Sequence, residues 1–261
     1  MKAAAGARAR NPLRVRCYRF VRTCVHAVEG VGTTMLVFPL VSPERRRALV
    51  KGWSARLLRI LKIEARVEGE VATGNVLLVS NHVSWLDIFV LNAHHPVRFV
   101  AKSEIARWPV LSQMVRGAGT VFIERERRRD THRVNEDMAR LLAGGDVVAI
   151  FPEGTTTDGR DILPFKSSLL QPIVDAQGHV QPVALRYRDH AGEHASAPAY
   201  VGETTFVQCF WAICGERMLT VEVVAPPALP ARDAHRRELA RDAEVAIRTA
   251  LKREAPATGP A

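Results

Sequence analysis

A histidine and an aspartate lie five positions apart in the stretch Asn81–Asp87, which reads NHVSWLD. On a regular helix, residues with this spacing point about 140° away from each other. His82 and Asp87 can therefore pair only if the histidine lies in a turn and the aspartate in the first or second turn of a helix. The carboxylate would then hold one ring nitrogen and leave the other to act as a base. Taken alone, such a pair is more often a surface histidine beside a capped helix.

A second polar stretch, FPEGTTTDG at residues 151–159, directly follows an apolar run. Gly154 allows the backbone to approach a ligand closely, and neighbouring N–H groups can point at an anion or an alkoxide. Glu153 and Thr155 add a carboxylate and a hydroxyl at the same place. The alternative for this stretch alone is an Asp-Gly turn with threonines on the surface.

Two cations also follow predicted strands. Lys102 ends the run VRFVAK, and Arg125 comes soon after GTVFIE. Both can face the same cleft, where a pair of cations would suit a phosphate group. We expect the remaining arginines of the cluster Arg125–Arg129 to be solvated.

The elements that position these residues alternate along the chain. Strands are predicted at Val76–Ser80, Val97–Ala101, Gly119–Ile123, Val147–Phe151, Val180–Tyr187 and Leu219–Val224, and helices from about Trp85 to Asn92 and at Trp108–Arg116, Arg129–Ala143 and Arg232–Arg253. Such alternation predicts an α/β fold with a largely buried sheet. The histidine and glutamate stretches then lie at strand ends, where α/β sheets bind ligands.

The composition is that of a globular protein, with 47% hydrophobic and 25% charged residues in a chain of 261. The four cysteines form no C-x-x-C pair, which favours reduced, structural thiols in a cytosolic setting. The net charge of +10 is uneven, because residues 1–62 contain fourteen Lys or Arg against two acids. An anionic partner of the N-terminal quarter is therefore expected, either nucleic acid or a membrane.

Apolar runs beside these basic residues favour the membrane. The uncharged run Gly30–Val41 has twelve residues, whereas a bilayer span needs about 20. A cleaved signal peptide is a competitor, but the run begins late and no cleavage pattern follows before Pro43. We expect a monotopic helix or a re-entrant hairpin.

The next segment, Arg45–Ile63, places Trp53, Leu57, Ile60 and Leu61 at helical spacing among basic residues. This pattern is typical of an interfacial membrane helix. The alternative is a helix whose apolar face packs on the domain and whose basic face is solvated. No zinc-finger spacing or aromatic ribonucleoprotein motif supports nucleic acid as the partner.

The motifs occur in the order NHVSWLD, AKSEIARWPVLSQMVRGAGTVFIER, FPEGTTTDG and QPVALRY. In this order they closely resemble the four motifs of the lysophospholipid acyltransferases, nearest to the 1-acyl-sn-glycerol-3-phosphate acyltransferase type. The resemblance spans roughly Val76 to Tyr187. The H-x4-D and FPEG blocks, about seventy residues apart, make it specific.

The resemblance implies transfer of a fatty acyl chain from acyl-CoA or acyl carrier protein to the sn-2 hydroxyl of 1-acyl-glycerol-3-phosphate, which gives phosphatidic acid for phospholipid biosynthesis. His82 matches the family's catalytic base and Asp87 the carboxylate that orients it. Glu153, Gly154 and Thr155 match the block associated with acceptor binding. Lys102 and Arg125 match the basic positions associated with the acceptor phosphate. Pro182 and Val183 match the motif associated with the acyl side.

The implied fold is a glycerophosphate-acyltransferase-like mixed sheet flanked by helices, with a membrane-associated N-terminal helical pair. We therefore expect a basic mobile tail at 1–12, a membrane-associated helical segment at 13–63, an α/β acyltransferase domain at 64–255 and a disordered tail at 256–261.

The expected location is the cytoplasmic face of the cell membrane, with a monotopic or peripheral attachment. Expected partners are an anionic membrane surface, the lyso-lipid, the acyl thioester and acyl carrier protein, but no nucleic acid.

The chemistry agrees with the resemblance. An alcohol must lose a proton as it attacks a thioester, and a neutral histidine held by a carboxylate can take it. Direct transfer needs no cofactor and no metal. The chain contains no G-x-S-x-G motif, so a serine-hydrolase mechanism is not supported, and Ser84 is expected to be a helix cap.

One position departs from the family pattern, because Thr156 stands where many members have arginine after FPEGT. Lys102, Arg125 or Lys166, the last in LPFKSSLL, can replace the lost cation. Otherwise the acceptor is another lyso-lipid, such as a lyso-ornithine lipid or a lysophospholipid with a larger head group. Two rival functions are a non-catalytic lipid-binding protein anchored by residues 13–63 and a thioesterase.

Overall fold

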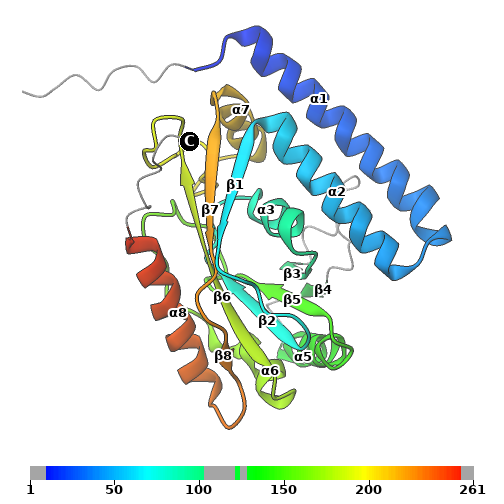
Figure 1. The fold of residues 1–261 in the computed structure, drawn as a ribbon, viewed down its shortest axis with the longest axis vertical. Helices are drawn as coiled ribbons and strands as arrows, with labels where there is room; N and C mark the ends of the chain where they lie inside the picture. Colours follow the sequence, from blue (N-terminus) through cyan, green and yellow to red (C-terminus); the bar gives the residue numbers. More distant parts are fainter. Residues whose placement is uncertain (1–9, 103–120, 124–127, 254–261) are drawn as a thin grey trace, which may run out of the picture.

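The computed structural model describes residues 10–102, 121–123 and 128–253. Its strands are β1 (Ile63–Glu68), β2 (Val76–Ser80), β3 (Arg98–Lys102), β4 (Val121–Ile123), β5 (Val147–Ile150), β6 (His179–Arg188), β7 (Leu219–Val224) and β8 (Leu229–Pro230). They form one sheet in the order β1-β7-β6-β2-β5-β3-β4, with β8 paired to β6 (Figure 1). Neighbours are parallel except where β6 meets β7 and β8, so the predicted mixed α/β sheet is confirmed.

The long strand β6 joins the two halves of the sheet. Its first half pairs with β2, from His179 opposite Val76 to Val183 opposite Ser80. Its second half pairs with β7, where Ala184 lies opposite Val224. Strand β2 is buried along its whole length, as expected for a parallel strand that is covered on both faces.

Helices cover both faces of the sheet. They are α1 (Leu13–Gly32), α2 (Pro43–Leu61), α3 (Asp87–His94), α5 (Arg128–Ala143), α6 (Gln171–Asp175), α7 (Phe206–Gly215) and α8 (Arg236–Lys252). One hydrophobic core contains residues of α2, α3 and α7 with Leu78 of β2. The other contains residues of α5, α6 and α8 with Leu77 and Val79. Successive strand residues point to opposite faces, so the two cores lie on opposite sides of the sheet.

Helices α1 and α2 form a pair that projects from the body at the right of Figure 1. Helix α1 continues through a π turn (Thr33–Val37) and a 3-10 turn (Phe38–Leu40) before the chain reverses into α2. The continuous helical segment Leu13–Leu40 has 28 residues and is long and apolar enough to cross a membrane, by length and composition alone. The apolar run that looked too short for a span is thus the end of a longer helix.

Helix α2 turns its apolar face into the domain. Leu57 and Leu61 are buried in the first core, whereas Arg56 is exposed. Trp53 stacks on His26 of α1 with ring centroids 4.4 Å apart, and its indole N–H donates to the His26 carbonyl oxygen at 3.0 Å. The alternative in which this apolar face packs on the domain therefore holds for α2, because its leucines pack against α3 and β1.

The N-terminal end of α1 is fastened to the C-terminal end of α7. Buried Arg19 donates to the carbonyl oxygens of Glu216 and Arg217 at 2.6 and 3.1 Å. The Asn11 side chain donates to the Glu216 carbonyl at 2.6 Å. The guanidinium of Arg16 lies over the Trp211 ring, 4.4 Å from its centroid. Arg19 and Asn11 thus both bind the carbonyl of Glu216, the residue that caps the C-terminus of α7, where a helix leaves carbonyl groups without partners.

Most predicted elements lie within a few residues of the observed ones, and β2 and β7 match at both ends. The terminal helix begins at Arg236 and not at Arg232, because the His235 side chain accepts the N–H of Arg237 as a cap. Strands β1 and β8 and helices α6 and α7 were not predicted. The helix predicted at Trp108–Arg116, Arg125 and most of both predicted tails lie outside the described residues.

Candidate active site

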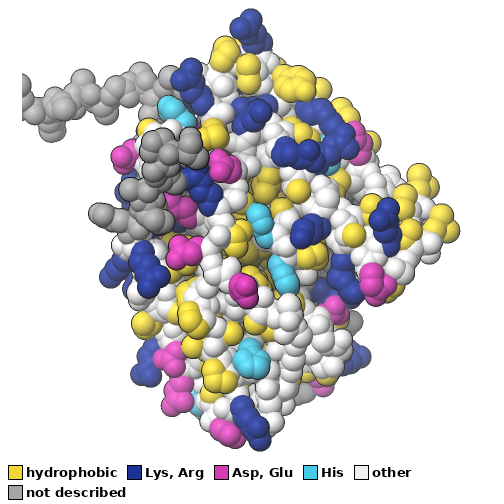
Figure 2. All heavy atoms as spheres, viewed as in Figure 1, with side chains coloured by type: hydrophobic (Ala, Val, Ile, Leu, Met, Phe, Trp, Pro, Cys, Tyr) yellow, Lys and Arg dark blue, Asp and Glu magenta, His cyan; other side chains and the backbone are white. Residues whose placement is uncertain are grey.

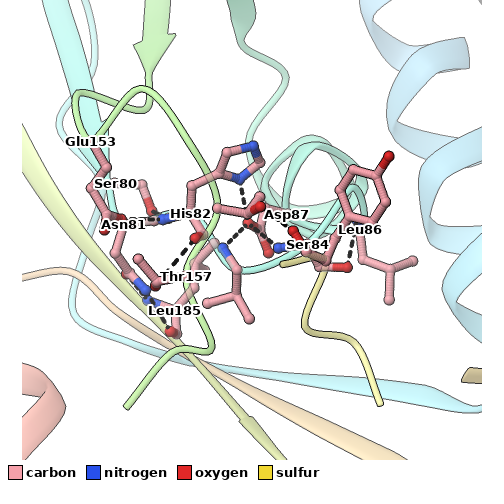
Figure 3. A network of polar contacts seen from close by, with 12 residues as sticks. Ser80, Asn81, His82, Ser84, Leu86, Asp87, Glu153, Thr157 and Leu185 are labelled. Atoms are coloured by element: carbon pink, nitrogen blue, oxygen red, sulfur yellow. Dashed lines mark hydrogen bonds and ion pairs between the residues drawn. The ribbon is translucent and has the colours of Figure 1, made fainter. Parts of the chain in front are cut away.

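The turn after β2 is fixed to the neighbouring strand by Asn81 (Figure 3). The Asn81 side-chain oxygen accepts the N–H of Leu185 at 2.7 Å, and its amide donates to the Leu185 carbonyl at 3.0 Å. Asn81 is fully buried, and this reciprocal pair continues the β2–β6 pairing beyond the last residue of β2. The turn is thereby held at the middle of the sheet.

His82 and Asp87 form the predicted pair. The Nδ1 atom of His82 lies 2.7 Å from Oδ2 of Asp87, which is the first residue of α3. The same oxygen accepts the N–H groups of Val83 and Ser84 at 2.8 and 2.9 Å. The histidine lies in the turn and the aspartate in the first helical turn, as the spacing required. Because a carboxylate only accepts, it assigns the proton to Nδ1 and leaves the lone pair on Nε2.

The imidazole of His82 is held by Asp87 at Nδ1 and by an aromatic ring against its face. It stacks on Phe151, which follows β5, with ring centroids 4.0 Å apart and an interplanar angle of 11°. Its side chain is 21% exposed, whereas Asp87 is fully buried. Within the part of the chain that the structure describes, Nε2 makes no hydrogen bond. This nitrogen can therefore take a proton from a group that reaches the site from outside.

Glu153 braces the backbone of the histidine. It is 2% exposed, and its two carboxylate oxygens accept the N–H of His82 at 2.7 Å and the N–H of Leu163 at 2.8 Å. Burial raises the pKa of Glu153, and these two backbone hydrogen bonds act against that increase. The acceptor-binding role predicted for Glu153 stays a prediction, since both oxygens here bind the chain itself.

A loop from residues 189–205 is fixed across the same turn. The N–H of Tyr200 donates to the Val83 carbonyl at 3.0 Å, and the hydroxyl of Thr156 donates to the Tyr200 carbonyl. The N–H of Thr157 donates to the His82 carbonyl at 2.8 Å. Thr156, which replaces the usual family arginine, therefore connects the glutamate stretch to this loop.

The other predicted substrate-binding residues are spread around the site. Gly154 takes a left-handed conformation with φ of 78°, which glycine adopts readily, and the adjacent Thr155 is exposed. Lys166 has an exposed side chain, and its N–H donates to the Pro152 carbonyl at 3.0 Å. The backbone of Lys102 ends β3 opposite Ile123. The phosphate-binding roles of Lys102, Lys166 and Arg125, which lies outside the described residues, stay predictions.

Strand β6 brings the fourth motif beside the histidine turn. Pro182 and Val183 lie opposite Val79 and Ser80 of β2. Four residues after Val183, the hydroxyl of Tyr187 donates to Oδ1 of Asp87 at 2.6 Å. Neither Tyr187 nor Phe151 was predicted as part of the site. Both lie within motifs already named, Phe151 at the start of FPEGTTTDG and Tyr187 at the end of QPVALRY, but their contacts with His82 and Asp87 join segments far apart in the chain, which no local pattern reports.

Glu153→Gln is expected to lower the free energy of unfolding by about 2 kcal/mol, because an amide offers one oxygen to two buried N–H donors. Urea titration of both proteins measures the difference. Glu203→Gln, at an exposed position, is the matched control and should stay within about 0.5 kcal/mol of the unchanged protein. Equal stability of the two variants would show that Glu153 does not brace the turn.

Comparison with known proteins places this site in a family. Residues 62–186 match the family model described as Acyltransferase. A 1-acyl-sn-glycerol-3-phosphate acyltransferase from Neisseria gonorrhoeae is 45% identical over 57% of this chain and 58% of its own length. The chain thus spans less than two thirds of that relative. A lyso-ornithine lipid O-acyltransferase from Pseudomonas aeruginosa is 37% identical over 81% of both chains.

The fold is shared with a solved structure. The crystal structure of the 1-acyl-sn-glycerophosphate acyltransferase PlsC from Thermotoga maritima matches with a TM-score of 0.71 and 20% sequence identity. The match covers 94% of this chain and 98% of that one. The family is shown by sequence: the 37% identity to the Pseudomonas aeruginosa relative over 81% of both lengths, with the family-model match, shows that the chain belongs to the acyltransferase family.

Proposed function

We propose that the protein transfers a fatty acyl chain from an acyl thioester to the hydroxyl of a lyso-lipid, with His82 as general base. The observation that supports this proposal is the 2.7 Å contact between Nδ1 of His82 and buried Asp87, which leaves Nε2 of a side chain that is 21% exposed with no hydrogen bond in the described part of the chain. Nε2 takes the hydroxyl proton as the oxygen attacks the thioester carbonyl. The tetrahedral intermediate expels the thiolate sulfur, which recovers the proton from Nε2, so one ester forms and one thioester breaks.

The first candidate acceptor is 1-acyl-glycerol-3-phosphate, acylated at its sn-2 hydroxyl to give phosphatidic acid. Relatives named for this activity are 45% identical to the chain over 148 residues. Lys102, Arg125 and Lys166 are the proposed phosphate ligands, and acyl-CoA or acyl carrier protein is the proposed donor. No cofactor or metal has a role in the proposed reaction.

A lyso-ornithine lipid is the second candidate acceptor. The Thr156 hydroxyl is used to hold the Tyr200 carbonyl, so the third motif offers no charge where the family often has arginine. Three relatives named lyso-ornithine lipid O-acyltransferases align over 75–81% of this chain, whereas the 1-acyl-sn-glycerol-3-phosphate acyltransferase from Neisseria gonorrhoeae aligns over 57%. An amino-acid head group has no phosphate to bind, which would make a missing arginine unimportant.

The test offers both acceptors side by side to purified protein in detergent with acyl-CoA, and measures released thiol and acylated lipid. Preference for lysophosphatidate supports the first acceptor, and preference for the ornithine lipid supports the second. Thiol release without acceptor would indicate a thioesterase. A protein that releases no thiol with either lipid, from acyl-CoA or from acyl carrier protein, would be the lipid-binding rival and would contradict the proposal.

Arg125→Ala is expected to raise the apparent KM for lysophosphatidate by about tenfold and to leave the KM for acyl-CoA unchanged, because a charged hydrogen bond contributes about 1.5–3 kcal/mol. Initial rates with each substrate varied in turn measure the two constants. Arg160→Ala, at an exposed position, is the control. Equal increases in both constants would remove Arg125 from the phosphate site.

We propose that α1 attaches the protein to the membrane surface, as a monotopic or peripheral protein on the cytoplasmic face. Tyr18, Val21, Val25, Val28 and Met35 recur at intervals of three, four or seven residues and are all exposed, so they form one apolar stripe. Figure 2 shows hydrophobic side chains gathered at the tip of the helical pair, with Lys and Arg over the same helices. Apolar area beside cations suits an anionic lipid surface.

Val28→Glu is expected to weaken binding to anionic vesicles by about tenfold, because it places a charge in the middle of this stripe. Co-sedimentation with phosphatidylglycerol vesicles measures the partition. Val245→Glu on α8 is the matched control, since Val28 is 69% exposed and Val245 57% exposed. Equal binding of the two variants would show that α1 is not the lipid-facing element.

A further inference from the structure

Tyr187 occupies the side of Asp87 that faces away from the histidine. It is the ninth of the ten residues of β6 and is 2% exposed. Its hydroxyl donates to Oδ1 of Asp87 at 2.6 Å, while Oδ2 accepts from His82 and from two backbone N–H groups. Both carboxylate oxygens are therefore held, each by a different part of the fold.

We infer that Tyr187 is a positioning residue for acyl transfer, which fixes the Asp87 carboxylate so that Oδ2 meets Nδ1 of His82. This inference rests on the proposed function, because it assigns to Tyr187 an effect on the base of that reaction. Tyr187 itself touches no reacting atom. Nothing in the sequence motifs assigns it this role.

The position of Tyr187 is set independently of α3, which carries Asp87. Tyr187 lies opposite Val221 of β7, and the neighbouring Arg186 forms an ion pair with Glu222 of the same strand. Asp87, by contrast, belongs to the helix that follows the histidine turn. The Tyr187 hydroxyl is thus held by the sheet, and its hydrogen bond sets the orientation of the Asp87 carboxylate plane.

The hydroxyl can act only as a donor here. Burial and the negative charge of Asp87 raise the pKa of Tyr187 well above its usual value of 10. A phenol that stays protonated gives Oδ1 one partner, which satisfies a carboxylate that is fully buried. Without it, the carboxylate would keep three donors on Oδ2, no described group would donate to Oδ1, and rotation about the bond to Cβ would be less restricted.

Tyr187→Phe tests the inference, because it removes one oxygen and keeps the ring in the core. We expect kcat for acyl transfer to fall about tenfold, while KM for the acceptor and for acyl-CoA stay within about twofold, since no substrate contact is lost. Thr249→Val, which also removes one hydroxyl and lies at an exposed position of α8, is the matched control and should keep the full rate. An unchanged kcat in Tyr187→Phe, or a KM that rises as much as kcat falls, would overturn the inference.

A second pair of variants separates positioning from packing, and also applies if Tyr187→Phe does not fold. 4-Aminophenylalanine and 4-methylphenylalanine at position 187 both fill the space of the hydroxyl, but only the amino group can donate a hydrogen bond. We expect the amino variant to keep at least about a third of the kcat and the methyl variant to lose about tenfold. Equal rates would show that the hydroxyl has only a packing role.

Failure of this inference differs from failure of the proposed function. If His82→Ala keeps full activity, the base itself is wrongly assigned and Tyr187 has nothing to position. If His82→Ala is inactive while Tyr187→Phe keeps the full kcat, the proposed function stands and only the role of Tyr187 is refuted.

Discussion

His82→Ala is expected to lower kcat for acyl transfer by about a thousandfold, because general-base catalysis contributes about 10²–10⁴ in rate. The fold should remain intact, since the backbone of residue 82 keeps its hydrogen bonds to Glu153 and Thr157. Single-turnover acyl transfer with saturating substrates measures the chemical step, and circular dichroism with thermal unfolding checks the fold.

The matched control for this variant is His179→Ala, which removes an exposed histidine at the start of β6. It should leave the rate unchanged. A folded His82→Ala protein with the rate of the control would refute the proposed mechanism, whichever lipid is the acceptor.

Asp87→Asn is expected to lower kcat by about a thousandfold and the free energy of unfolding by about 3 kcal/mol. The carboxylate accepts from four donors in a fully buried place, whereas an amide presents one oxygen and directs two N–H groups at the remaining donors. An amide N–H directed at Nδ1 would also favour the other tautomer of His82. That tautomer carries its proton on Nε2, the nitrogen that should accept the hydroxyl proton.

Both effects are measurable on one preparation, by initial rates and by urea titration. Asp242→Asn, on the exposed side of α8, is the control and should change stability by less than about 0.5 kcal/mol. A variant that loses stability but keeps its rate would show that Asp87 supports the fold and not the histidine.

The parts of the fold that sequence analysis predicted are those specified by local pattern. Strand β2 is a short apolar run between polar turns, and its bounds are those predicted. Strand β1 was missed although apolar and charged residues alternate along IEARVE, because it lies at the edge of the sheet and only Ile63 is buried, so it lacks the apolar run that marks β2. Helix α7 was missed because FVQCFWAICG is apolar almost all round, so no helical face stands out. Edge position and burial are decided by tertiary structure, which local periodicity does not report.

The same distinction holds within the site. The His82–Asp87 pair was predictable because five residues of backbone determine whether the two side chains can meet. The brace from Glu153 to the His82 N–H crosses 71 residues, and the bond from Tyr187 to Asp87 crosses 100. Only the pairing of β2 with β5 and β6 brings these groups together, and a single sequence contains no direct signal of that pairing.

Helix α1 is attached to the rest of the protein in two places, to α7 through Arg19 and to α2 through the His26–Trp53 stack. A helix held in this way cannot tilt alone, so a lipid-bound α1 would set the orientation of the whole molecule. The height of His82 above the lipid boundary would then be constant. A lyso-lipid would be acylated only if its hydroxyl can rise to that height, and acceptors would be selected by reach as well as by charge.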